Sequence, residues 1–205
     1  MGLFNFKNKN KNKNKNKNTK PDIYTIAYDY YGYDIRFVSG STDPQLYKQI
    51  NDIITKETFD INSIAEFKIL NKDSDEDTFW AFYDSWLEKL RENDYVIHLN
   101  NEIGIIEFTN KINKLLKIIN ETKKLDVNFI ANRYKEEINK YSYYNQDIDE
   151  NFNYDILEAN IIAAELRNMG YELINFFNGF DNDDKTIISI DDIKTMKEIE
   201  EKLAN

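Results

Sequence analysis

The chain divides into a basic leader and an acidic remainder, and this division limits which part of it can fold. Six Lys-Asn repeats occupy residues 7–18, and seven lysines give residues 1–20 a charge of +7. Because the whole chain carries −10, residues 21–205 carry −17. A self-repelling segment without apolar periodicity cannot build a core. We therefore expect a disordered Lys-Asn-rich tail over residues 1–20 and a single α+β domain over residues 21–205.

The composition of the chain limits its class and its chemistry. Residues 21–205 are long enough for one domain with a substantial core. The absence of cysteine excludes disulfides, thiolate nucleophiles and cysteine metal sites. No run approaches the roughly 20 apolar residues of a membrane span, and the leader lacks the apolar centre of a signal peptide. We expect a cytoplasmic protein, and the Asn-, Lys-, Ile- and Asp-rich composition is typical of an AT-rich bacterial genome.

Apolar periodicity predicts a mixture of hairpins, single strands and helices. The strands are expected over residues 23–28 and 34–38 (a first hairpin), 65–69, 95–99, and 171–178 and 185–190 (a second hairpin). Helices are expected after the caps Asp43 and Asp191, from the acidic run 73–77 to Leu90, and over 105–119, 127–141 and 157–169. The mixed order predicts an α+β fold, in which a small mixed sheet is packed by about five to six helices.

The single histidine and the aspartate clusters are the candidates for catalysis and metal binding. A Ser-His-Asp site would require His98, but no nucleophile motif accompanies it, so a structural role in a strand is favoured. Calcium binding by Asp181, Asp183, Asp184 and two further aspartates would need glycine where Thr186 stands. A hairpin turn followed by a helix cap is the favoured interpretation, and no metal or cofactor is expected.

Surface tyrosines and aspartates are the candidate binding residues. Tyrosine gives a large contact area at low entropic cost, and the dense tyrosine stretches lie beside acids. The alternative is that these rings pack into the core. The candidate binding residues are Tyr30, Tyr31, Tyr33, Tyr143, Tyr144, Asp181, Asp183 and Asp184.

The charge of each part of the chain indicates which partners it favours. A charge of −17 over residues 21–205 argues against nucleic-acid binding by the folded part and favours basic protein partners. The leader combines Leu3, Phe4 and Phe6 with seven lysines, and each lysine near an anionic lipid surface contributes up to ~1 kcal/mol. Weak membrane contact through the leader and a solvated linker are both consistent with this pattern.

The segment from Gly170 to Ile174, continued through the Asp-rich turn to Ile187–Asp191, resembles uncharacterised bacterial acidic α+β families. Some small acidic proteins of this appearance are immunity proteins, which neutralise toxins. The resemblance implies a non-enzymatic acidic binding protein that masks a basic toxin or another cationic protein. An uncharacterised hydrolase with a carboxylate-lined pocket and a peripheral membrane protein are the alternatives, since 37 acidic residues make close carboxylate pairs inevitable.

Overall fold

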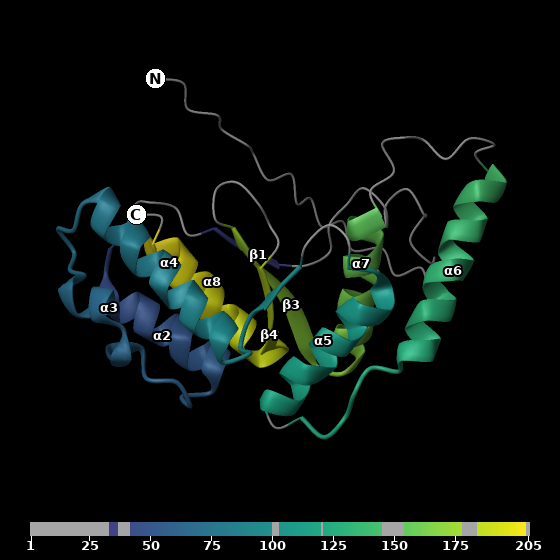
Figure 1. Cartoon of the computed structure of the whole chain (residues 1–205), viewed down its shortest axis with the longest axis horizontal. Helices are drawn as coiled ribbons and strands as arrows, with labels where there is room; N and C mark the ends of the chain where they lie inside the picture. Colours follow the sequence, from purple (N-terminus) through teal and green to yellow (C-terminus); the bar gives the residue numbers. More distant parts are fainter. Residues whose placement is uncertain are drawn as a thin grey trace.

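A β-sheet lies between two groups of helices and separates two apolar cores (Figure 1). This computed structural model describes residues 33–36, 42–99, 103–119, 121–144, 154–177 and 184–203. The predicted tail at 1–20 and the predicted strand at 23–28 lie outside the described residues. Within the described part, the mixture of helices and strands confirms the predicted α+β class.

The sheet has four strands in the order β1-β3-β4-β2. They are β1 (Tyr33–Arg36), β2 (Ile97–His98), β3 (Tyr171–Phe177) and β4 (Asp184–Ser189). The antiparallel pair of β3 and β4 confirms the second predicted hairpin, and β2 adds antiparallel to β4. β1 runs parallel to β3, with Tyr33 opposite Ile174, although the sequence analysis placed Tyr33 in a turn.

The first helical layer covers one face of the sheet with α2 (Pro44–Thr55), α3 (Ala65–Ile69), α4 (Glu76–Glu92) and α8 (Ile193–Leu203). The predicted cap holds: the Asp43 side chain accepts a hydrogen bond from the Gln45 amide at 3.0 Å. The core of this layer is aromatic. Trp86 is fully buried, stacks on Phe82 at 5.9 Å and meets Phe176 of β3 edge-on at 6.1 Å.

Two local predictions in this layer are wrong. Residues 65–69 form helix α3 instead of a strand, because the Leu70 amide donates to the Glu66 carbonyl and Phe67 packs on Phe82 of α4. The expected cap Asp191 lies inside a 3₁₀ turn (Ile190–Asp192) that precedes α8. Ser189 caps that turn instead, since its hydroxyl accepts from the Asp191 amide.

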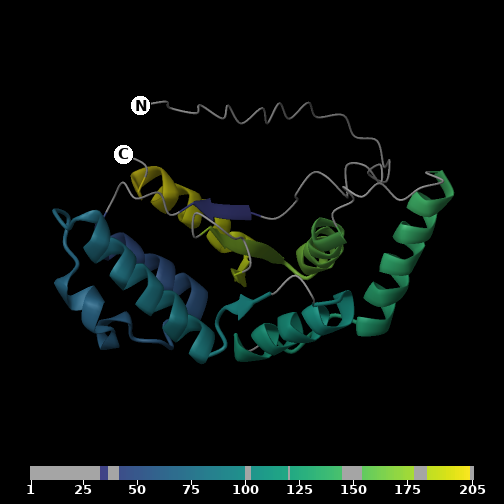
Figure 2. The ribbon, with the colours of Figure 1, turned by 45° about the horizontal axis from the view of Figure 1, so that its top comes forward.

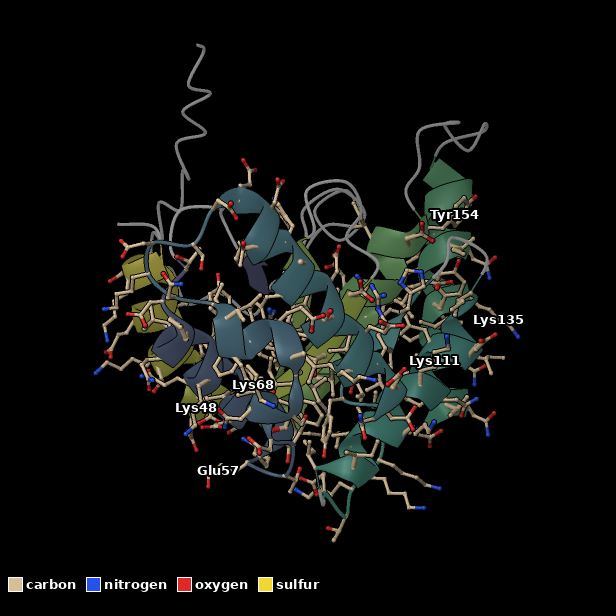
Figure 3. The ribbon with its side chains drawn as sticks, turned by 60° about the vertical axis from the view of Figure 1, so that its left-hand side comes forward. Lys48, Glu57, Lys68, Lys111, Lys135 and Tyr154 are labelled. Atoms are coloured by element: carbon tan, nitrogen blue, oxygen red, sulfur yellow. The ribbon has the colours of Figure 1, made fainter. Side chains whose placement is uncertain are left out.

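The second helical layer covers the other face of the sheet with α5 (Ile105–Ile118), α6 (Val127–Tyr144) and α7 (Tyr154–Asn168). α7 is buried almost all round, because it packs between β3 and α6, while α6 forms the outer edge of this layer (Figure 2). Gly170 ends α7 with φ +90°, the left-handed conformation that favours glycine, as predicted. In Figure 3, Lys48 and Lys68 mark the first helical layer on one side of the molecule. Lys111 and Lys135 mark the second helical layer on the other side.

None of the helices in the described part of the chain is both long enough and apolar enough to cross a membrane.

Candidate functional site

The structure describes the side chain of Asp184 alone among the eight predicted binding residues. Tyr30, Tyr31, Asp181 and Asp183 lie outside the described residues. The backbone of Tyr33 belongs to β1, and Tyr143 and Tyr144 belong to the last turn of α6.

Asp184 is a buried structural residue, which corrects its expected place in an exposed turn. It begins β4 and is 1 % exposed. Arg91, in the last turn of α4, donates two hydrogen bonds to this carboxylate. One runs from Nε to Oδ1 of Asp184 at 2.8 Å, and the other runs from Nη2 to Oδ2. This pair of hydrogen bonds links α4 to strand β4 of the sheet. The hydrogen bond to Asp184 is the main reason that the pKa of Arg91 is raised.

His98 lies in strand β2 as expected, and its ring contacts the same carboxylate. His98 pairs opposite Asp184, and its Nδ1 lies 3.2 Å from Oδ1 of Asp184. The imidazole is 53 % exposed. An Asp-His pair orients an imidazole in many hydrolases, but it needs a nucleophile. Within the described residues, Asp184 is the side chain that hydrogen-bonds to this ring.

The outward face of α4 carries exposed carboxylates that form no salt bridge within the described part of the chain. Asp77, Asp84 and Glu88 are all exposed and follow helical spacing, which places them on one stripe about 16 Å long. Among the described residues, no lysine or arginine forms a salt bridge with any of them. The two basic residues near the end of α4 form their salt bridges with other acids, Lys89 with Glu92 and Arg91 with Asp184. Weaker electrostatic attraction also links Lys89 to Glu88 and Arg91 to Asp84.

A pocket of about 510 Å³ opens at the first turn of α5. Its wall combines residues 104–107 with Asn110, Tyr134 of α6 and Glu158 of α7. Glu158 is 6 % exposed and sits in the middle of a buried helix. Its Oε1 accepts a hydrogen bond from the Ile105 amide at 3.1 Å, so it satisfies one of the free amides at the start of α5. Gly104, the residue before α5, provides no side-chain cap.

The electrostatic environment of Glu158 favours its protonated form near neutral pH. Burial raises the pKa of Glu158 to about 7, although hydrogen bonds from Tyr134 and the Ile105 amide oppose this shift. Burial also raises the pKa of Tyr134, and the adjacent Glu158 adds to that effect. A carboxyl group that titrates near pH 7 beside a neutral phenol can accept or donate a proton, or serve as a counter-ion.

Sequence analysis missed Glu158, although the sequence contains a weak signal. Glu158 interrupts an apolar stretch of α7 in which its neighbours Leu157 and Ala159 are buried. A charged residue at such a position needs a partner, and the partner comes from other helices. The described residues contain no cluster of three or more acidic or histidine side chains placed to hold a metal ion.

Comparison with protein-family models, with curated proteins and with solved structures found no match for this chain.

Proposed function

We propose that this chain is a non-enzymatic acidic binding protein whose partner is a cationic protein. The observation that carries the proposal is the outward face of α4, where Asp77, Asp84 and Glu88 are exposed and form no salt bridge with a lysine or arginine among the described residues. The charge of −17 over residues 21–205 supports it. An immunity protein that masks a basic toxin is the concrete form, and the resemblance of residues 170–191 supports this form.

The physical basis is electrostatic complementarity. A single-sign surface raises the rate at which an oppositely charged partner arrives, and added salt weakens that attraction. Charged groups at the edge of an interface act mainly on the association rate, whereas buried apolar contacts set the dissociation rate. The α4 stripe is exposed and flanks an aromatic core, so we assign it the steering role.

The test is affinity capture from a lysate of the source cells with three baits. The first bait is the parent chain, and the second carries Asp77→Asn, Asp84→Asn and Glu88→Gln. The third carries Glu57→Gln, Glu136→Gln and Asp191→Asn, which are exposed positions on separate elements with the same total charge change.

We expect the parent and the third bait to recover the same basic protein and the second bait to lose it. Equal recovery by all three baits would show that the α4 face is not the binding surface. Recovery of no basic protein by the parent would contradict the proposal as a whole.

A hydrolase with a carboxylate-lined pocket is the second candidate. The pocket at α5 favours it, because Glu107 and Glu158 both line a partly apolar hollow and Glu158 titrates near neutral pH. The test is hydrolysis of a panel of chromogenic ester, phosphate and glycoside substrates by the parent and by Glu158→Gln. Turnover that the substitution abolishes would favour this candidate, and no turnover of any substrate would argue against it.

A further inference from the structure

The pocket at the start of α5 stands apart from the proposed α4 binding face. The two features belong to opposite helical layers, because α4 packs in the first core and α5 and α7 pack in the second (Figure 1). The pocket is a shallow hollow of about 510 Å³ that is open to solvent, with the Glu158 carboxyl in its wall. The pocket therefore needs an explanation that the steering role of α4 does not supply.

We propose that this pocket binds an alkylammonium or guanidinium group, with the Glu158 carboxylate as its counter-ion. This inference goes beyond the proposed function and does not depend on it.

The charge of the pocket wall selects a cation. Glu107 and Glu158 are the charged residues among the described residues that line the pocket. Glu107 already pairs with Lys111 at 3.8 Å, whereas Glu158 forms no salt bridge with a described lysine or arginine, so Glu158 carries the selection. An anion would meet both carboxylates, and the Ile105 amide at the helix start is already bonded to Glu158. A bound cation would instead favour the ionised form of Glu158 and offset the cost of its burial.

The pocket wall also has groups for the rest of such a ligand. A carboxylate has about four acceptor positions, and the Ile105 amide and the Tyr134 hydroxyl use two of them. The remaining acceptor positions can receive N–H donors. Ile106, whose side chain is 55 % exposed, lies beside them in the wall and offers apolar surface for an alkyl chain.

Binding should depend on pH through Glu158. The titratable groups around it are Glu107 from α5, Tyr134 from α6, and Asp155 and Tyr154 from α7. Lys111 of α5 also lies next to these groups, but its charge is paired with Glu107 at 3.8 Å. With a pKa of about 7, the ionised fraction of Glu158 falls about 30-fold between pH 8 and pH 5.5. The affinity for a cation should fall by a similar factor.

The experiment titrates the full chain with n-butylammonium and n-butylguanidinium and follows the backbone amide signals of residues 105–107 by NMR. We expect saturable shifts at pH 8 with a dissociation constant on the order of 1 mM, about 30-fold weaker binding at pH 5.5, and none with n-butanol. Glu158→Gln should weaken binding at least tenfold. Glu136→Gln removes an exposed carboxylate of α6 outside the pocket and should bind like the parent.

A second variant keeps the test valid if Glu158→Gln disturbs the fold. Tyr134→Phe retains the ring in the wall but removes a hydrogen bond that lowers the pKa of Glu158, so the pH midpoint of binding should move upward. A merely structural tyrosine would leave that midpoint unchanged. No amide shift up to 50 mM probe, on the order of 50 times the expected constant, or unchanged affinity in Glu158→Gln would overturn the proposal.

A blocked lysine, N-acetyl-lysine methylamide, identifies the source of the cation. Binding of this probe together with n-butylammonium would point to a protein side chain, and binding of n-butylammonium alone would point to a small free amine. Both results support the proposed chemistry. The capture experiment on α4 uses different substitutions, so either proposal can fail without the other.

Discussion

Replacement of Glu158 by glutamine should stabilise the protein at alkaline pH, although it removes a buried, hydrogen-bonded side chain. Glutamine keeps an oxygen that accepts from the Ile105 amide but has no charge to bury. Burial raises the pKa of Glu158 from the ordinary value of 4.5 to about 7. At about 1.36 kcal/mol per pH unit, ionised Glu158 lowers the free energy of unfolding by up to about 3 kcal/mol.

The sign of this pH dependence follows from the raised pKa. The folded state binds the Glu158 proton more tightly than the unfolded state does, so this residue makes the free energy of unfolding decrease as pH rises from 4.5 to about 7. At pH 8 the parent bears the full cost of the buried charge. We therefore expect the free energy of unfolding of Glu158→Gln to be about 1–3 kcal/mol higher than that of the parent at pH 8. Near pH 4 the two values should be equal.

Urea unfolding at pH 4, 6 and 8, followed by tryptophan fluorescence, measures this difference. The control Glu136→Gln removes an exposed carboxylate and should stay within about 0.5 kcal/mol of the parent at each pH. A Glu158→Gln variant that is less stable than the parent at pH 8 would refute the reasoning. Glu158 would then be an ionised cap for α5, and its hydrogen bonds would stabilise the folded state by more than the burial of its charge destabilises it.

Three further predictions concern other parts of the chain. Arg91→Met should lower the free energy of unfolding by about 3 kcal/mol in urea titrations, because it leaves the buried Asp184 carboxylate without its guanidinium, and adding Asp184→Asn should recover part of the loss. Equal stability of Arg91→Met and the parent would contradict the structural role given to this pair. Gly170→Ala should lower the free energy of unfolding by about 1 kcal/mol, because alanine is strained at a φ of +90°. An added Cβ meets no atom within 4 Å, so no steric clash contributes. An unchanged melting temperature would contradict this prediction. Deletion of residues 1–20, which carry +7, should reduce sedimentation with anionic liposomes, and equal sedimentation would dismiss the leader as a membrane contact.

The sequence predicts the long elements of this fold because their signals are local. α2 begins with an aspartate cap and proline, and α4 follows an acidic run. Each strand of the β3–β4 hairpin contains a short apolar run, Leu173–Ile174 in β3 and Ile187–Ile188 in β4. Residues 65–69 escape this reasoning because α3 has only five residues, too few for the spacing of apolar residues to separate a strand from one helical turn. The helix buries Phe67 but leaves Ile69 exposed, whereas a strand would place both on one face. The parallel position of β1 beside β3 also depends on a pairing between distant segments.

The candidate sites were less predictable than the fold, because they depend on tertiary contacts. Sequence analysis expected Asp184 at the surface, yet its burial follows from Arg91, which lies 93 residues earlier in the chain. The Glu158 pocket unites residues from α5, α6 and α7, and no local motif relates their positions. The α4 stripe was not predicted either, although helical spacing alone places Asp77, Asp84 and Glu88 on one face.

The association rate between this chain and its captured basic partner tests the central claim most directly. Surface plasmon resonance between 50 and 500 mM salt, on the order of a threefold change in Debye length, separates association from dissociation. We predict an association rate that falls at least tenfold over this range and is also slowed by Asp77→Asn, Asp84→Asn and Glu88→Gln, with little change in dissociation. An association rate that responds neither to salt nor to these three substitutions would contradict the account.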